Sequence, residues 1–207
     1  MTATLPRHLL SCTAGRKNYW RRAPAIQATL RNITEHNRLK AELQILATTD
    51  VLTGIVNRRQ FLALASRELK RAARLHHPLA LAMLDMDGLK HINDTHRHAA
   101  GDQVLVAFTD TCRKNIREID VFARVGGDEF VVLLPETERA EAYKAVERVQ
   151  LALAAQPVYL GGQPVIVTFS AGITSMTDMV ESLDELLARA DSALYRAKAA
   201  GRNRVAL

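Results

Sequence analysis

Apolar and polar positions along this chain follow two periodicities, which predict the strands and helices of a mixed domain. Apolar runs typical of buried strands lie at residues 79–85, 121–125, 129–134, 157–160 and 163–174. Apolar residues at helical spacing predict helices over about residues 57–76, 101–116, 138–154 and 183–200. Thr137 is expected to begin the third of these helices. Gly161-Gly162 is expected to form a turn, and residues 204–206 a small edge strand.

The order of these elements predicts the fold class. Strand, helix, hairpin, helix and strand, with extra helices at both ends, is a split βαβ arrangement of the α+β class. We therefore expect a ferredoxin-like (βαββαβ) fold with an antiparallel central sheet. In such a sheet the end of the strand at 79–85 lies beside the hairpin formed by 121–125 and 129–134.

A separate helix is predicted in front of this domain, from Thr34, which can cap it, to about Thr48. Leu39, Leu43 and Leu46 fall at i, i+4 and i+7 and form one apolar stripe. Because so short a helix is marginal in water, the stripe is expected to be covered. We interpret residues 32–49 as a helical coiled-coil linker that pairs with a second copy. Packing of the stripe on the domain itself is the alternative.

Composition narrows the class of protein. At 207 residues with 48% apolar content, the chain can hold one ordinary domain plus an extension. No apolar run approaches the length of a membrane helix, so no membrane span is expected. Cys12 and Cys112 indicate no disulfide framework, and a cytoplasmic location is the expectation.

The positive charge is concentrated at the N-terminus. The chain carries 28 Lys and Arg against 22 Asp and Glu, a net charge of +6. Residues 1–31 contain no acidic residue and six basic ones, which equal the whole excess: Arg7, Arg16, Lys17, Arg21, Arg22 and Arg31. Since the remaining chain is neutral, the globular part has no net basic field, which argues against a nucleic-acid partner.

Carboxylates stand at two expected strand ends. Gly126-Gly127 reads as the turn of the hairpin, with Asp128 and Glu129 at its mouth on opposite sides of the strand. Asp85 and Asp87 flank Met86 at the end of the strand at 79–85. The topology should bring Asp85 and Asp128 together. Mg²⁺ is commonly held by one or two carboxylates plus substrate phosphates, so this edge of the sheet is a candidate metal site.

Several motifs in this order resemble the GGDEF family of diguanylate cyclases, over about residues 50–207. The matching segments are Asp50–Gly54 with Asn57-Arg58-Arg59, Asp85-Met86-Asp87 with Lys90 and Asn93-Asp94, Gly101-Asp102, Gly126–Phe130, and Leu194–Lys198 with Gly201-Arg202-Asn203. The resemblance implies the palm-like fold of nucleotidyl cyclases. Ile33-Thr34-Glu35 resembles the join that follows a PAS sensor domain in this family, so residues 1–31 are interpreted as a basic sensor-domain remnant.

The resemblance also implies an activity. A diguanylate cyclase, which is a nucleotidyltransferase, condenses two GTP into cyclic di-GMP and two pyrophosphates at a homodimer interface. It implies Mg²⁺ as cofactor, with Mn²⁺ as a substitute, held by Asp85, the Met86 carbonyl, Asp128 and Glu129. Asp128 or Glu129 would also be catalytic, by helping to deprotonate the attacking hydroxyl.

Substrate-binding residues follow from the same resemblance. The Gly88 and Leu89 amides, Lys90, and Lys198 with Arg202 would hold the triphosphate beside Gly126 and Gly127. Helix-end cations that only complement the helix dipole are the alternative for Lys198 and Arg202. Asn93 and Asp102 would read guanine, and Asp102 favours GTP over ATP because adenine lacks the donors that it accepts.

A regulatory site is implied as well. Arg117 and Asp120 match the RxxD motif of product inhibition, with Arg148 as a second arginine that binds cyclic di-GMP. The alternative is an i,i+3 surface ion pair worth a few tenths of a kcal/mol, on the order of 0.3. The chain departs from the family pattern at Leu89, commonly Phe, and at Arg97, commonly Gly. A positive φ at Arg97 would cost on the order of 1 kcal/mol.

Two other functions compete with the cyclase. One is a catalytically silent receptor that binds cyclic di-GMP or GTP. Degenerate domains of that kind usually lose acidic motif residues, all of which are present here. The other is a polymerase-like or nucleic-acid-binding palm, against which the neutral globular part and the lack of an aromatic-basic strip argue.

Overall fold

The computed structural model describes residues 33–177 and 182–207. The basic segment at 1–31 and its interpretation as a sensor remnant lie outside these residues. The chain divides into two units, residues 1–47 and 48–207. The shorter unit contains nearly all of α1 (Ile33–Thr48), on which Leu39, Leu43 and Leu46 are 46%, 66% and 60% exposed.

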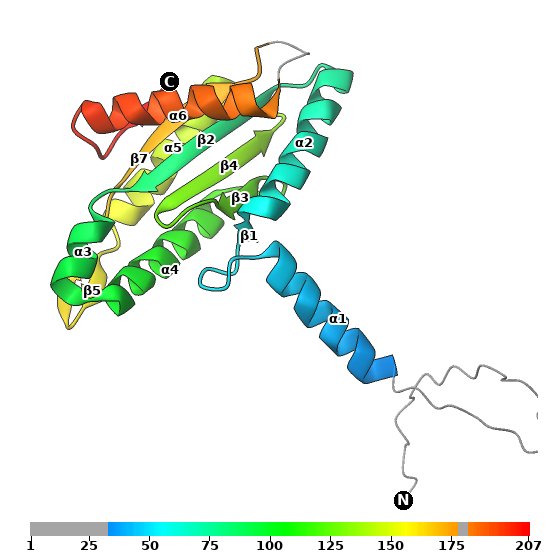
Figure 1. Cartoon of the computed structure of the whole chain (residues 1–207). Helices are drawn as coiled ribbons and strands as arrows, with labels where there is room; N and C mark the ends of the chain where they lie inside the picture. Colours follow the sequence, from blue (N-terminus) through cyan, green and yellow to red (C-terminus); the bar gives the residue numbers. More distant parts are fainter. Residues whose placement is uncertain (1–32, 178–181) are drawn as a thin grey trace, which may run out of the picture. The chain divides into compact units, whose positions relative to one another are not determined.

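The larger unit is a mixed α/β domain (Figure 1). Its elements in chain order are β1 (Val56–Asn57), α2 (Arg58–Leu75), β2 (Leu79–Met86), α3 (Leu89–His96), α4 (His98–Asn115), β3 (Val121–Arg124), β4 (Glu129–Pro135), α5 (Arg139–Ala154), β5 (Val158–Leu160), β6 (Gln163–Val165), β7 (Phe169–Ser175), α6 (Leu183–Ala199) and β8 (Val205–Ala206). No helix in the described ranges is both long enough and apolar enough to cross a membrane.

The main sheet has the strand order β1-β3-β4-β2-β7-β8. Its four central strands pair antiparallel, and the short edge strands β1 and β8 pair parallel with their neighbours. The expected α+β fold with an antiparallel central sheet is therefore confirmed. The edge strand expected near the C-terminus is β8, whereas β1 was not predicted.

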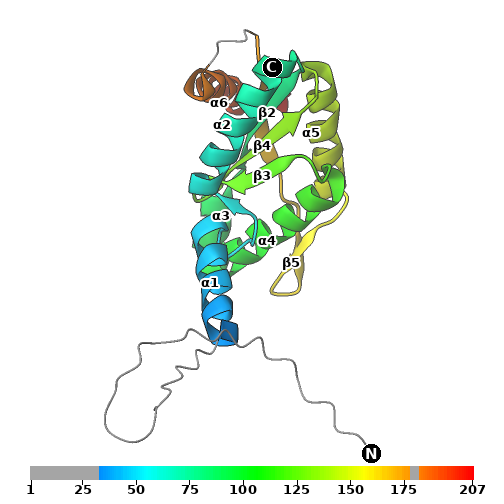
Figure 2. The same cartoon turned by 90° about the vertical axis from the view of Figure 1, so that its right-hand side faces the viewer.

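Helices cover both faces of this sheet, as Figures 1 and 2 show. On one face α2 packs on β3 and β4 and α6 on β2 and β7, through residues such as Phe61, Leu186 and Leu133. On the other face α4 and α5 pack on the same strands, with Phe108 of α4 edge-on to Phe130 at 4.8 Å between ring centroids. Because β2 is covered on both sides, it reads as a continuous apolar run rather than an alternating one.

The structure corrects three boundaries. The helix expected from residue 101 begins at His98 and follows a separate helix, α3, that was not predicted; Arg97 joins the two with φ 72°. The strand expected over 163–174 is two strands, because β6 pairs only with β5, around Gly161-Gly162 at φ 58° and 86°. Thr137 does not cap α5: Glu138 precedes the helix, and the Thr137 hydroxyl donates to the Pro135 carbonyl at 2.8 Å.

Candidate active site

Acidic residues meet where β2 and β4 lie side by side. Asp85, near the end of β2, stands directly opposite Glu129, the first residue of β4. Directly opposed residues of an antiparallel pair project from the same face of the sheet. The Met86 amide donates to the Asp128 carbonyl at 3.1 Å, which holds the residue before β4 against the end of β2. Asp128 is therefore in the loop, and Glu129 is the cross-strand neighbour of Asp85.

The hairpin at this edge differs from the expected two-residue turn. Residues 125–128 separate β3 from β4, and the Val125 and Gly126 amides both donate to the Glu129 carbonyl, at 2.9 and 3.3 Å. Neither Gly126 nor Gly127 has a positive φ. A Cβ atom at Gly126 would lie 2.5 Å from Glu129 Oε2. A side chain at 126 would therefore displace the Glu129 carboxylate, which lies across this backbone.

A lysine from α6 completes this cluster. Lys198 Nζ lies 2.7 Å from Asp85 Oδ2, and the Asp85 side chain is only 10% exposed. Burial raises the pKa of Asp85, the nearby Asp128 and Glu129 carboxylates raise it further, and Lys198 opposes both effects. The site therefore holds more negative charge than its lysine compensates, which favours a bound cation.

The fit to a metal ion depends on the substrate. No group of three or more His, Cys, Asp or Glu side chains in the described ranges is arranged to hold a metal by itself. Mg²⁺ usually takes only one or two carboxylates and fills its other positions with substrate phosphates and water. The carboxylates of Asp85, Asp128 and Glu129 with the Met86 carbonyl suit such a shared site, because all are hard oxygen donors.

Asp87 has a structural role, which distinguishes it from Asp85. Its carboxylate accepts from the Thr168 hydroxyl at 3.0 Å, from the Ser170 hydroxyl at 2.8 Å and from the Asn203 amide at 3.0 Å. The Asn203 bond fixes a turn in which Gly201, Arg202 and Asn203 all have positive φ. Asp87 thus ties the backbone beside Arg202 to the end of β2.

The triphosphate candidates lie at two helix ends. Gly88 precedes α3 with φ 72° and no side-chain cap, and Leu89 and Lys90 form the first turn of that helix. The amides of a helix N-terminus favour anions. Lys198 lies in the last turn of α6, and Arg202 follows it in the anchored turn. The Leu89 side chain is buried in the core, so only its backbone is available to a ligand.

The guanine candidates lie where α3 meets α4. Asn93 Oδ1 is buried and has no hydrogen-bond partner among the described residues. A Cβ atom at Gly101 would lie 2.0 Å from that oxygen, so the absence of a side chain there makes room for Asn93. Asp102, the next residue, is exposed on α4. An unsatisfied buried acceptor is costly, and a ligand donor would relieve that cost.

The three inhibitory-site candidates gather around the end of α4. The Arg117 Nη2 atom donates to Asp120 Oδ1 at 2.7 Å, to Thr137 Oγ1 at 2.6 Å and to the Pro135 carbonyl at 3.0 Å. Hydrogen bonding to Asp120 raises the pKa of Arg117. Arg148 donates through Nε to the Asn115 carbonyl at 3.2 Å. Arg117 is thus more than an i,i+3 ion pair, since it also joins two backbone segments.

Sequence reasoning missed a bridge between Asp50 and the hairpin that carries Asp128 and Glu129. Arg124 donates through Nη1 to Asp50 Oδ1 at 3.1 Å and through Nη2 to the Gly127 carbonyl at 2.7 Å. Burial raises the pKa of Asp50, but hydrogen bonds from Thr53 and Arg124 outweigh it, so the pKa is lowered. Asp50 belongs to one of the motifs, but nothing in the sequence indicates that Arg124 is its partner.

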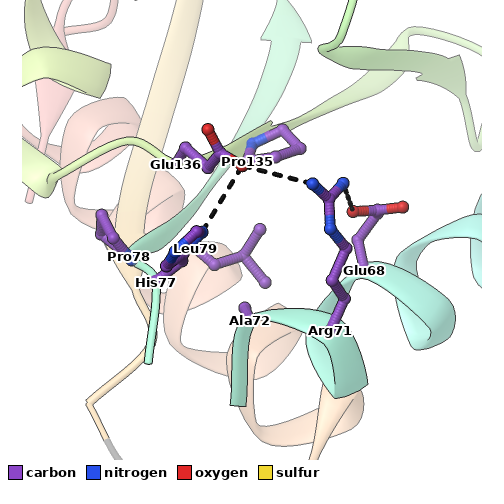
Figure 3. Close-up of a pocket in the computed structure, with 8 residues that line it drawn as sticks. All are labelled: Glu68, Arg71, Ala72, His77, Pro78, Leu79, Pro135 and Glu136. Carbon is purple, nitrogen blue, oxygen red and sulfur yellow. Dashed lines mark hydrogen bonds and ion pairs between the residues drawn. The ribbon is translucent and has the colours of Figure 1, made fainter. Parts of the chain in front are cut away.

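One pocket can be set aside as a ligand site. Figure 3 shows Arg71 of α2 between Glu68 and Glu136, with His77 directed at the same Glu136 carboxylate. The Arg71–Glu136 and His77–Glu136 separations are 3.3 and 3.5 Å. The hollow that they border has a volume of only about 10 Å³, enough for roughly one water. These contacts tie the end of α2 to the end of β4.

The chain is similar to several characterised proteins. It is 44% identical over 138 residues to diguanylate cyclase DgcP of Pseudomonas aeruginosa, covering 67% of this chain and 20% of that protein. It is 39% identical over 171 residues to the response regulator PleD of Caulobacter vibrioides, covering 82% of this chain and 37% of that protein. The chain thus spans less than half the length of these curated relatives.

Solved structures have the same fold. The coiled coil and GGDEF domain of DgcB from Caulobacter crescentus, in complex with c-di-GMP, superposes with a TM-score of 0.77 at 29% identity, covering 84% of this chain and 94% of that one. Diguanylate cyclase SiaD from Pseudomonas aeruginosa, in complex with its activator SiaC, gives 0.75 at 36% identity, covering 84% and 66%. The family model described as diguanylate cyclase, GGDEF domain, matches residues 47–204. From that match, and from the acidic edge of β2 and β4, it follows that this chain belongs to the GGDEF family.

Proposed function

We propose that this chain is a diguanylate cyclase, which joins two GTP molecules into cyclic di-GMP and releases two pyrophosphates. The observation that carries the proposal is the acidic edge itself: Asp85 opposite Glu129, Asp128 beside Met86, and Lys198 on Asp85. Relatives named diguanylate cyclase support it at 36–44% identity. A silent receptor has no need for an intact set of these residues.

Asp85, the Met86 carbonyl, Asp128 and Glu129 would hold Mg²⁺, with Mn²⁺ as a substitute. When bound, the ion lowers the pKa of the attacking 3′-hydroxyl and neutralises charge that develops on the α-phosphate. Asp128 or Glu129 accepts the proton of that hydroxyl. Their position at the open hairpin, beside Gly126 and Gly127, leaves room for the nucleotide to approach.

One GTP binds along the edge of the domain. The Gly88 and Leu89 amides and Lys90 hold the phosphates at the start of α3, while Lys198 and Arg202 hold them from the end of α6. Asn93 and Asp102 read the guanine edge, because a carboxylate accepts from the N1–H and N2 amino groups that adenine lacks. The unpartnered Asn93 Oδ1 is consistent with a polar ligand at this place.

A second domain supplies the other GTP. With one nucleotide in each domain, the two α-phosphates and hydroxyls face each other across a two-fold axis, so the active unit is a homodimer. The exposed leucines of α1 suit a parallel coiled coil that raises the effective concentration of the two half-sites. Arg117, Asp120 and Arg148 bind the product and hold two domains apart, which slows the enzyme as cyclic di-GMP accumulates.

The test is a product assay on the purified chain. Incubation with GTP and Mg²⁺ should give cyclic di-GMP and pyrophosphate in a 1:2 ratio, separated by chromatography, and ATP should give no cyclic dinucleotide. Binding of GTP or cyclic di-GMP without any turnover would instead support the receptor function. Retention on single-stranded nucleic acid, with no effect of GTP, would support a polymerase-like palm.

A further inference from the structure

Lys198 and Asp85 are each assigned to a different ligand, yet they are bonded to each other. In the proposed function Asp85 holds the metal and Lys198 the triphosphate. In the structure Lys198 Nζ lies 2.7 Å from Asp85 Oδ2, with the two side chains 33% and 10% exposed. A metal bound to that carboxylate at about 2.0–2.1 Å would place two positive charges side by side. The lysine and a metal ion therefore compete for the charge of this carboxylate, and directly so for the Oδ2 atom.

We propose that Lys198 is a place-holder for the metal. In the protein without nucleotide, its ammonium neutralises Asp85 within an acidic cluster that would otherwise repel itself. When Mg²⁺ and GTP occupy the site, Lys198 leaves Asp85 and pairs with the triphosphate. The inference rests on the proposed function, because it needs the metal at Asp85 and phosphate near the end of α6.

The surroundings of Lys198 allow this exchange without movement of the helix. Gly172 lets the α6 backbone pack directly on β7, where an added Cβ would lie 2.0 Å from the Leu194 amide nitrogen. Asp87 fixes the turn after α6 through the Asn203 amide. The backbone around Lys198 is thus held at both sides, while its side chain has a flexible four-carbon stem and is one-third exposed. Only the side chain has to rotate.

The exchange predicts coupled binding. Without triphosphate, the metal must displace the partly buried Lys198 ammonium, which then has no other anion to pair with. The affinity of the metal for the nucleotide-free protein is therefore low. With triphosphate present, the displaced ammonium finds a new partner, and the metal binds more tightly. By linkage the metal raises the affinity for the triphosphate by the same factor, and such couplings typically reach about 5- to 150-fold.

The experiment measures metal binding rather than activity. Mn²⁺ is titrated into the nucleotide-free chain and followed by electron paramagnetic resonance, for wild type, Lys198→Met and Lys90→Met. Lys198→Met should bind Mn²⁺ about fivefold more tightly than wild type or better, since nothing has to be displaced. Lys90→Met is the matched control: it removes a phosphate cation from α3, for which the described residues contain no ion pair, and should change Mn²⁺ affinity less than twofold.

A second arm adds α,β-methylene-GTP, which cannot release pyrophosphate. The analogue should raise the Mn²⁺ affinity of wild type strongly and that of Lys198→Met much less. Two results in the nucleotide-free titration would overturn the place-holder: an Mn²⁺ affinity of Lys198→Met equal to that of wild type, or an increase in Lys90→Met as large as that in Lys198→Met. Thermal unfolding checks that each variant is folded, and Lys198→Gln replaces Lys198→Met if the latter is not.

Failure of the proposed function is recognisable in the same titration. Asp85→Asn removes a ligand and should weaken Mn²⁺ binding in the presence of the analogue. If Asp85→Asn binds Mn²⁺ as wild type does, the metal is held elsewhere and the proposed site is wrong. If Asp85→Asn loses Mn²⁺ binding while Lys198→Met has the Mn²⁺ affinity of wild type, the proposed metal site is supported and only the place-holder role of Lys198 is refuted.

Discussion

Two aspartates at the end of β2, Asp85 within the strand and Asp87 just after it, differ in what they contact. Asp85 has a raised pKa, owing first to burial, and faces Glu129 and Lys198. Asp87 is fully engaged by two hydroxyls and a backbone amide. Because three donors within the protein already bind the Asp87 carboxylate, chemistry is assigned to Asp85 and anchoring to Asp87.

Asp128→Asn and Asp85→Asn should each lower cyclic di-GMP synthesis by about a hundredfold or more while the domain stays folded. The amide keeps the size of the side chain but removes the charge that binds a metal. Product analysis and circular dichroism check both halves of this prediction. Asp110→Asn, at an exposed position on α4, is the control and should keep full activity. Full turnover by a folded Asp85 or Asp128 variant would refute the metal assignment.

Gly101→Ala should raise the KM for GTP by about tenfold or more, because the new methyl would meet Asn93 Oδ1 at 2.0 Å and displace the amide that reads guanine. Steady-state kinetics provide the measurement. Gln103→Ala, exposed on the same helix, is the control and should leave KM unchanged. If Gly101→Ala has the KM of wild type, Asn93 does not take part in guanine recognition.

At the scale of elements, the sequence predicts most accurately the bounds of strands that are buried along their whole length. β2 and β4 are buried along almost their whole length, so apolar runs located them within a residue or so. α3 was missed because it buries only Leu89 and Ile92, and it ends at a non-glycine residue with positive φ. The split of β6 from β7 was missed because both are strands, and only their partners differ.

Contacts within the site could be predicted less well than its residues. The motif positions Asp50, Asp87 and Lys198 are all visible in the sequence. Their partners are not, because the Asp50–Arg124 and Asp87–Asn203 bonds join residues 74 and 116 positions apart. Such pairs depend on sheet register and on the loops after each element, which local periodicity does not encode.

The Asp50–Arg124 bridge, which joins the first turn of the domain to the β3–β4 hairpin, gives a pH-dependent prediction. The pKa of Asp50 is lowered from its ordinary value of 3.8, so its stabilisation is present above that value and is lost as pH falls through the folded-state pKa. Asp50→Asn should therefore be less stable than wild type by about 1 kcal/mol at pH 7. The difference should shrink at about pH 3. Urea unfolding at both pH values measures it, and a difference that is independent of pH would contradict the ionic bridge.

At the scale of the whole molecule, the proposed function requires two copies of the chain to meet. Replacing Leu39, Leu43 and Leu46 by Ser should lower specific activity at low protein concentration by about tenfold and restore part of it at high concentration. Activity measured over a protein dilution series tests this. Asn37→Ser with Lys40→Ser changes two exposed polar positions of the same helix and controls for lost helix propensity. If leucine variants and wild type are equally insensitive to dilution, α1 does not organise the dimer.

Product inhibition is the second property that the proposed function gives to the dimer. Arg117→Ala should keep turning over as cyclic di-GMP accumulates, whereas wild type slows, and calorimetry should find that the variant has lost product binding. The variant also loses bonds to Pro135 and Thr137, so a small drop in stability is expected. Lys114→Ala, exposed nearby on α4, should behave as wild type. Tight binding that survives loss of both Arg117 and Asp120 would locate the inhibitory site elsewhere.

The contact between Gly172 and α6 has a consequence for how variants of this domain are interpreted. The α6 backbone rests on β7 with no side chain between them at this point, and Leu194 lies one helical turn before Lys198. An alanine at 172 would push α6 away from β7, because its methyl group would overlap the α6 backbone. Lys198 would then move away from Asp85 by about the distance that the helix moves. In a mutational survey Gly172 should therefore lose activity as a site residue does, although it is a core position of β7. The spacing between α6 and β7 at Gly172 therefore sets the position of Lys198 relative to the carboxylates at the edge of the sheet.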